Sequence, residues 1–164
     1  ARSPLVVDGG QTPVGVESTI VKVEDGRLRL LRPGGIPAGE IETLTGVPLL
    51  RHAGAIEAPG MMASHYAPRA RLRLDAHEMK PGEALLAFGP HRIDGAADAI
   101  AVRNLSPHAD LIEAASRLFG FLHELDAAGA DAIAVEPVPA TGLGEAINDR
   151  LARAAAPRDD KPSE

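Results

Sequence analysis

The sequence contains no cysteine, which excludes a disulfide framework, a zinc–thiolate site and a cysteine nucleophile. Tryptophan is also absent, and aromatic residues make up only 2% of the 164 residues. Apolar residues nevertheless account for 45% of the chain. We therefore expect an aliphatic core of leucine, valine, isoleucine and alanine, in one ordinary domain or in one small domain plus part of another.

Basic residues are fewer than acidic ones, 17 Lys and Arg against 23 Asp and Glu, which gives a net charge of −6. A general nucleic-acid-binding surface normally needs a basic patch, so we expect no such surface here. This balance still permits a small anionic ligand held by one or two arginines. No apolar run approaches the ~20 residues of a membrane-spanning helix, so no membrane partner is expected.

The first residues, ARSPLVVDGG, lack an initiator methionine and the charged-then-apolar layout of a signal peptide. LVVDGG is typical instead of a buried strand that runs into a glycine turn. A chain that begins abruptly on a strand is expected to be a fragment whose earlier part is missing.

The pattern of the N-terminal part is mainly β. Two β-rich runs, STIVKV and RLRLL, are joined by EDG, and this spacing predicts a hairpin. A short helix is predicted from Pro37 to Thr45, closed by the glycine that follows. Three strands and one short helix make a weak core, so residues 1–50 are expected to be part of a larger domain.

Residues 51–71 have neither a helical nor a strand period. They include two prolines and two glycines. This composition is typical of an interdomain linker.

From residue 72 onward the pattern is α/β. The predicted elements are strands at 84–89, 98–103 and 131–136 and helices at 107–128 and 142–156. Ser106 is the predicted N-cap of the first of these helices, ahead of Pro107. Apolar strands that alternate with amphipathic helices indicate a mostly parallel sheet covered by helices. Residues 72–156 are therefore expected to form a second domain, followed by a disordered tail at 157–164.

The stretch GLGEAI, residues 142–147, fits the G-x-G-x-x-A dinucleotide fingerprint after a strand. That fingerprint needs a further strand that ends in an acidic residue about 20 positions on. Only a polar tail follows the last helix here. The glycines are better explained as letting the helix start close to the sheet, and an NAD-binding protein is the weaker hypothesis.

Other catalytic and metal-binding motifs are missing from the sequence. None of the six histidines forms an H-x-x-x-H pair, and neither a G-x-S-x-G elbow nor a Walker A loop occurs. We therefore predict no metal ligand and no catalytic nucleophile.

The two ends of the predicted hairpin carry polar residues that the turn itself does not need. Arg32 follows an apolar strand and precedes Pro33-Gly34-Gly35. A guanidinium makes planar, bidentate contacts with phosphate or carboxylate, and the glycines leave room for a ligand near the backbone. At the other end, Glu17-Ser18-Thr19 either begins a solvent-facing strand or presents hydroxyls to a polar substrate.

Three stretches, DGGQTPVGVESTIV, LLRPGGI and APGMMASHYAP, occur in this order. Together they resemble the later part of the YrdC-like domain and the linker of the L-threonylcarbamoyladenylate synthase family, in its long two-domain form. EAASRLFGFLHELDAAGADAIAVE and GLGEAINDRLARAA resemble that form's C-terminal Rossmann-like domain. The resemblance covers almost the whole chain.

The resemblance implies an α/β chain, with part of a YrdC-like α+β domain followed by a small Rossmann-like domain. It also implies a cytoplasmic nucleotidyltransferase that joins L-threonine, bicarbonate and ATP, with Mg²⁺, into threonylcarbamoyl-AMP and releases pyrophosphate. A downstream tRNA threonylcarbamoyl transferase would then modify tRNA position 37. Because the chain has a net charge of −6, no strong direct tRNA-binding surface is expected on it.

The resemblance implies roles for four residues of this sequence. Ser18, in the E-S-T motif, would contact threonine, and Arg32, in the L-R-P-G motif, would contact the nucleotide. Tyr66 and His65, in the H-Y-A-P motif, would lie at the ATP site as the linker covers it. The hairpin ends would thus face one pocket, with serine toward the amino acid and arginine toward phosphate.

The sequence departs from the family pattern in two places. The Lys-x-Arg and Ser-Ala-Asn motifs of the family's N-terminal half do not occur, and residues 62–64 are smaller and less charged than in some relatives. The fragment alone is therefore expected to be inactive. The alternative is a non-catalytic nucleotide-binding or regulatory Rossmann-like module.

Overall fold

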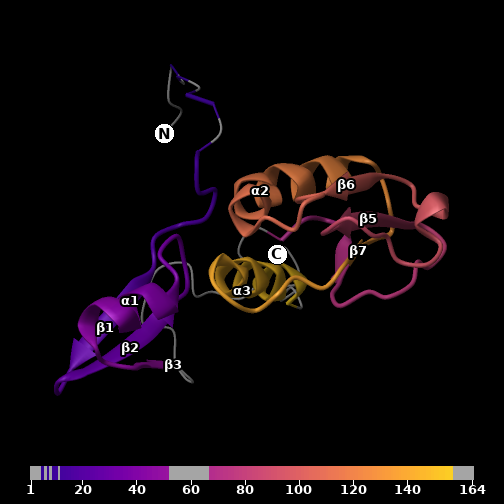
Figure 1. The fold of residues 1–164 in the computed structure, drawn as a ribbon. Helices are drawn as coiled ribbons and strands as arrows, with labels where there is room; N and C mark the ends of the chain where they lie inside the picture. The colour runs from indigo at the N-terminus through magenta and orange to yellow at the C-terminus, as the bar shows by residue number, and fades with distance from the viewer. Residues whose placement is uncertain (1–4, 6, 8, 11, 52–66, 157–164) are drawn as a thin grey trace, which may run out of the picture.

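The computed structural model describes residues 5, 7, 9–10, 12–51 and 67–156. They form two lobes, which we call the first lobe (residues 12–51) and the second lobe (residues 67–156) (Figure 1). Most of the predicted linker and the whole predicted tail lie outside the described residues, so the domain boundaries remain predictions.

A three-stranded sheet forms the first lobe, in the order β1-β2-β3. Its strands are β1 (Ile20–Glu24), β2 (Arg27–Arg32) and β3 (Leu49–Arg51). β1 and β2 are antiparallel, and the turn residues Asp25 and Gly26 both have positive φ, 52° and 72°. Positive φ at both central positions is the geometry of a tight hairpin turn, so the predicted hairpin is confirmed.

Helix α1 (Ala38–Thr45) follows β2 and packs on this sheet. Ala38 and Ile41 contact the cluster that Leu30 and Leu49 form on the sheet. Pro37 precedes the helix, and Gly46 ends it in the left-handed conformation, with its N–H donating to the Glu42 carbonyl. The prediction of this helix is confirmed, and β3 returns beside β2 in parallel.

The buried strand predicted at the start of the chain is wrong at the two positions that the structure describes there. Leu5 is 78% exposed and Val7 is 84% exposed, and neither lies in a strand. Within the described residues no strand pairs with this segment, so the apolar side chains have no sheet on which to pack.

A four-stranded sheet forms the centre of the second lobe, in the order β4-β7-β5-β6, with every neighbouring pair parallel. The strands are β4 (Arg71–Arg73), β5 (Glu83–Ala87), β6 (Val102–Asn104) and β7 (Ala132–Val135). The predicted α/β fold with a mostly parallel sheet is therefore confirmed.

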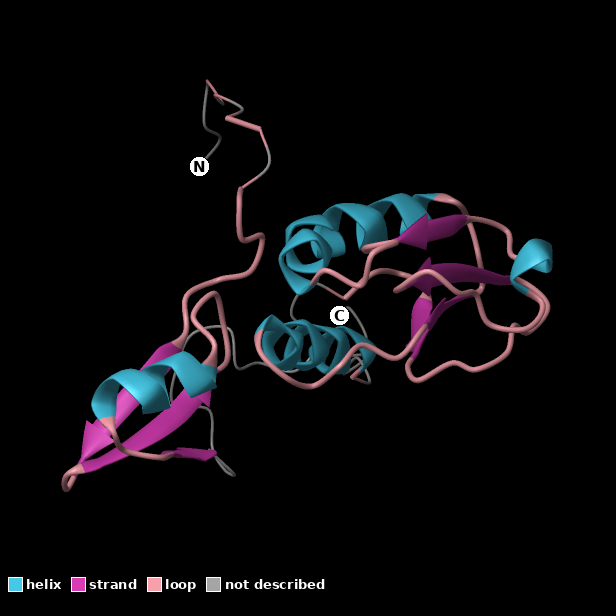
Figure 2. Ribbon diagram, in the orientation of Figure 1, coloured by secondary structure: helices cyan, strands magenta, loops and turns pink. Residues whose placement is uncertain are grey.

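Helices α2 (Leu111–Ala127) and α3 (Leu143–Ala155) cover the same face of this sheet. Ala84 and Leu86 of β5 point into the cluster that the helices form, whereas Leu85 and Ala87 point the other way. That second face is covered by loop segments and by the short 3₁₀ helix η1 (Ala96–Asp98). Figure 2 shows the two helices together beside the sheet.

The predicted helix at 107–128 begins four residues later than expected. Asp110 is the N-cap, and its side chain accepts hydrogen bonds from the N–H groups of Ile112 and Glu113. Ala109 has a positive φ of 59°, which a helix interior does not allow. Ser106 instead accepts from the Asp110 N–H and donates to the Glu113 carboxylate, so it links the preceding loop to the first turn.

The strand predicted at 98–103 is shorter and lies further along the chain, because residues up to Asp98 form η1. Pairing with β5 begins where Ile100 N–H donates to the Glu83 carbonyl, and Leu85 N–H then donates to the Ala101 carbonyl. In the described part of the chain, no helix is both long and apolar enough to cross a membrane.

Candidate functional site

The site lies where the two ends of the hairpin meet. Glu17-Ser18-Thr19 leads into β1, and Pro33-Gly34-Gly35 follows β2. Because the strands are antiparallel and Ile20 pairs with Arg32, the start of one strand lies beside the end of the other. The topology therefore brings together two motifs that are more than ten residues apart in sequence.

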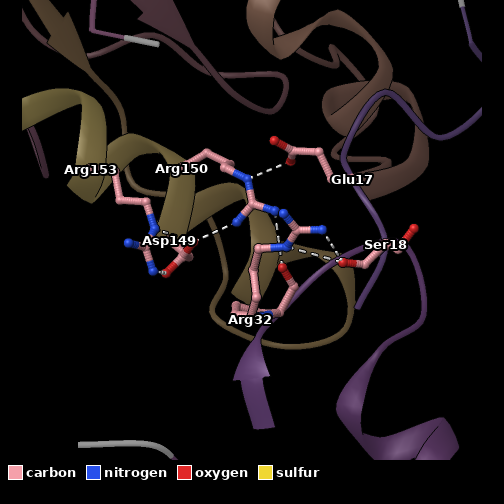
Figure 3. Close-up of polar contacts among 7 residues, drawn as sticks. Glu17, Ser18, Arg32, Asp149, Arg150 and Arg153 are labelled. Atoms are coloured by element: carbon pink, nitrogen blue, oxygen red, sulfur yellow. Dashed lines mark hydrogen bonds and ion pairs between the residues drawn. The ribbon is translucent and has the colours of Figure 1, made fainter. Parts of the chain in front are cut away.

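Arg32 is half-buried and contacts Ser18 directly. Its Nε and Nη2 donate to the Ser18 carbonyl oxygen at 3.2 and 2.8 Å. Figure 3 shows the Ser18 hydroxyl pointing away from this guanidinium. The two predicted ligand-binding residues are thus neighbours, joined through the backbone of Ser18 and not through its side chain.

Glycine at position 34 allows the two motifs to pack this closely. A Cβ at Gly34 would lie 2.3 Å from the Glu17 carbonyl oxygen and 2.4 Å from the Ser18 carbonyl carbon. The next N–H, of Gly35, donates to the Glu17 carbonyl at 2.9 Å. The glycines of the R-P-G-G run therefore serve this backbone contact in the fold, in addition to any ligand.

Thr19 connects the motifs a second time. Its Oγ1 accepts from the Ile36 N–H at 3.1 Å and donates to the Ile36 carbonyl at 2.6 Å. The Thr19 hydroxyl thus satisfies both the N–H and the carbonyl of Ile36, and this pair of hydrogen bonds fixes how the two hairpin ends are aligned.

Arg150 reaches the same place from helix α3 of the second lobe. Its side chain is only 3% exposed. Nε donates to Glu17 Oε2 at 2.7 Å, Nη2 donates to the Pro33 carbonyl at 3.2 Å, and Nη1 donates to Asp149 (Figure 3). One buried guanidinium therefore contacts both hairpin ends.

Glu17 is charged in this arrangement. Burial of its carboxyl favours the neutral form, yet its pKa lies below its ordinary value, because hydrogen bonds from Arg150 and from its own backbone N–H, with the charges of Arg150 and Arg32, together outweigh the burial. The carboxylate thus balances part of the positive charge that the two arginines bring to the site.

The sequence identified Ser18 and Arg32 but not Glu17 and Arg150 as a pair. Arg150 lies three residues after Ile147, on the side of α3 that carries the apolar stripe, so helical periodicity is the one signal that could have marked it as buried, and it was not used. Its partner, 133 residues earlier, had no comparable signal. His65 and Tyr66 lie outside the described residues, and their roles remain predictions.

The GLGEAI glycines have a structural explanation. Gly142 has a positive φ of 58° immediately before α3. A Cβ at Gly144 would lie 1.8 Å from the Pro139 carbonyl oxygen. Both glycines therefore serve the start of α3, but the close contact is with the preceding loop and not with the sheet, where it was expected. Among the described residues, no group of three or more His, Asp or Glu could hold a metal ion.

Comparison with known proteins gives concordant matches over most of the chain. The family model for the C-terminal domain of threonylcarbamoyl-AMP synthase matches residues 36–156. Proteins named threonylcarbamoyl-AMP synthase from Pyrococcus abyssi and Bacillus subtilis are 33% and 34% identical, each over 93% of this chain. This chain spans about half the length of these relatives, 49% in both cases.

A solved structure is similar as well. P. abyssi Sua5 complexed with L-threonine superposes with a TM-score of 0.74 at 30% identity, over 90% of this chain and 48% of the other. The similarity includes both lobes, because neither lobe alone makes up 90% of the chain.

Proposed function

This chain belongs to the threonylcarbamoyl-AMP synthase family, and from this we propose that it is part of an enzyme that forms threonylcarbamoyl-AMP. The substrates are L-threonine, bicarbonate and ATP, and the second product is pyrophosphate. The activated threonylcarbamoyl group passes to a downstream transferase that modifies tRNA position 37. We do not expect this chain alone to be active, because it spans about half the length of its relatives.

The observation that carries this proposal is the contact between Arg32 and Ser18. The guanidinium is held at the Ser18 carbonyl by two hydrogen bonds of 3.2 and 2.8 Å. A phosphate bound by Arg32 and an amino acid bound by Ser18 would therefore be adjacent. The solved relative complexed with L-threonine supports an amino acid as one of the two ligands.

The reaction needs positioning and charge stabilisation more than a side-chain nucleophile. The threonine amine adds to CO₂ with loss of a proton, or to bicarbonate with loss of water, and an oxygen of the resulting carbamate attacks the α-phosphorus of ATP. The bond from the α-phosphorus to the oxygen that bridges it to the β-phosphate breaks, and pyrophosphate leaves with the electron pair. Arg32 neutralises the charge that develops on the phosphates, and Ser18 orients threonine. His65 and Tyr66 contact the nucleotide, and Mg²⁺ accompanies ATP as a counter-ion.

Kinetics of the full-length protein test this proposal. The assay is pyrophosphate release that depends on threonine, bicarbonate and ATP. Arg32→Ala should lower turnover at least ~10-fold, because a group that stabilises transition-state charge is removed. Arg29→Ala is the matched control, since Arg29 lies on the same strand but pairs with Glu24 at the turn. Wild-type turnover in Arg32→Ala would refute the role of Arg32.

A further inference from the structure

We infer that Arg150 is a positioning residue for the site at Ser18 and Arg32, although it belongs to the other lobe. This inference rests on the proposed function. Arg150 would not touch the substrates. It would hold the two hairpin ends in the geometry that lets Ser18 and Arg32 bind neighbouring ligands.

The contacts of Arg150 fall on the sequence neighbours of both ligand residues. Glu17 immediately precedes Ser18, and Pro33 immediately follows Arg32. Arg150 bonds to the carboxylate of the first at 2.7 Å and to the carbonyl of the second at 3.2 Å. A shift of either hairpin end would break one of these two bonds.

The local needs of helix α3 do not account for an arginine at this position. Ile147 and Leu151, beside it on α3, are buried apolar residues, and burying a charged group is costly unless it is fully paired. Asp149 already has a partner one turn away in Arg153, with two hydrogen bonds of 2.8 Å each. What Arg150 adds is its reach to Glu17 and Pro33 in the first lobe.

Lobe attachment alone does not account for it either. A second ion pair already joins the lobes, between Arg51 of β3 and Glu145 of α3, at 2.8 Å. Arg51 is 54% exposed, against 3% for Arg150, and the Arg51–Glu145 pair does not contact the residues next to Ser18 or Arg32. The Arg51–Glu145 pair therefore offers a natural control for a contact that joins the lobes without touching the site.

Loss of Arg150 should lower the rate of the reaction, because catalysis depends on the exact placement of Ser18 and Arg32. A misplacement of ~1 Å in a site can cost about 10²-fold in rate. Supporting residues hold ligand-binding groups within a narrower range than that. Loss of Arg150 should therefore impair the reaction while the second lobe stays folded.

The test compares four variants of the full-length protein by steady-state pyrophosphate release at varied threonine and ATP. Arg150→Gln should lower kcat/KM about 10-fold or more. Arg153→Gln, on the same helix and with the same Asp149 partner, should stay within about twofold, as should Arg51→Gln. Arg150→Lys should recover part of the loss, because an ammonium keeps the pair with Glu17 but lacks the planar fork that also reaches Pro33. Equal losses in Arg150→Gln and Arg51→Gln, or wild-type values in Arg150→Gln, would overturn the inference.

Hydrogen exchange gives a readout that does not depend on activity. The N–H groups of Gly35 and Ile36 bond across the hairpin ends, to the Glu17 carbonyl and to Thr19 Oγ1. Arg150→Gln should speed exchange at these two amides, and the control variants should not. Unchanged exchange would overturn the inference. An inactive wild-type protein would overturn the proposed function instead, while the exchange result would still decide whether Arg150 holds the hairpin ends.

Glu17→Gln removes the same contact from the other side. It replaces one charged oxygen and keeps the shape of the side chain, so it serves if Arg150→Gln does not fold. It should reproduce the loss of kcat/KM and the faster exchange at Gly35. Wild-type behaviour of Glu17→Gln in both measurements would also overturn the inference.

Discussion

Gly34 lies so close to Ser18 that no side chain fits between the two backbones. A Cβ at Gly34 would stand 2.4 Å from the Ser18 carbonyl carbon, well inside van der Waals contact. The predicted phosphate-binding and threonine-binding ends of the hairpin can therefore lie this close only because residue 34 carries a hydrogen atom in place of a side chain.

Gly34→Ala should destabilise the first lobe by about 1–3 kcal/mol or more, because the methyl group meets backbone atoms that cannot rotate away. Gly39→Ala is the matched control: Gly39 lies in α1, and a Cβ there meets nothing within 4 Å. That change should be neutral or stabilising by up to about 1 kcal/mol. Urea unfolding of the full-length protein checks both, and equal stability of the two variants would contradict the prediction.

The same reasoning applies to the start of α3. Gly144→Ala places a methyl group 1.8 Å from the Pro139 carbonyl oxygen, so the loop or the helix must move. We expect a loss of about 1–3 kcal/mol in the free energy of unfolding. Gly120→Ala, in α2 and with nothing within 4 Å of its Cβ, should gain up to about 1 kcal/mol. A stable Gly144→Ala variant would mean that this glycine is not needed for the close approach.

The buried Glu83 should make the stability of the second lobe depend on pH. Its pKa lies below the ordinary value because the hydrogen bonds from Arg73, at 2.7 and 2.6 Å, outweigh its burial. Since the folded-state pKa is the lower one, this stabilisation is complete above the ordinary carboxyl pKa and is lost as pH falls through the folded value. The pKa of Arg73 is raised in turn by the same hydrogen bonds, which affects only the strongly alkaline range.

Glu83→Gln isolates this contribution. It should lower the free energy of unfolding by about 1–3 kcal/mol near neutral pH, because a charge-assisted bidentate contact is replaced by a neutral one. The two stability curves should converge as the pH falls from the ordinary carboxyl pKa through the lower folded-state pKa of Glu83. Urea denaturation across that range checks the prediction, and a constant difference between the curves would contradict it.

The start of α2 offers a direct test of the corrected boundary. Asp110→Ala should cost about 1 kcal/mol, because two N–H groups of the first turn lose their acceptor. Asp110→Asn keeps an oxygen in the same place and should cost clearly less. Thermal unfolding by circular dichroism distinguishes the two variants, and an equal effect would show that the cap contributes little.

Local signals in the sequence predicted the elements that form through local interactions. The EDG turn, the Pro37 and Gly46 ends of α1, and the apolar stripe of α3 each lie within the element that they specify. β3 and β4 were missed because each is three residues long and is held by pairing with a distant strand. Ser106-Pro107 is a common helix start, but the Asp110 side chain caps the helix instead.

In the candidate site, too, residues in local motifs could be predicted, and a residue held by a distant contact could not. Ser18 and Arg32 stand in recognisable motifs, and the hairpin between them predicted their proximity. Arg150 could not be assigned from sequence, because its partners Glu17 and Pro33 lie in the other lobe and no local pattern reports a contact across 133 residues. Helical periodicity can indicate that a residue is buried, but it does not indicate which residues of another lobe that residue contacts.

Helix α3 serves both lobes, because its apolar side packs in the core of the second lobe while Arg150 bonds to the hairpin ends of the first. One lobe can therefore not be exchanged without regard to the other. A chimera that takes its second lobe from a homologue keeps the contact with Glu17 only if that homologue has an arginine at the position of Arg150, so grafting should succeed only when both members of the pair are present.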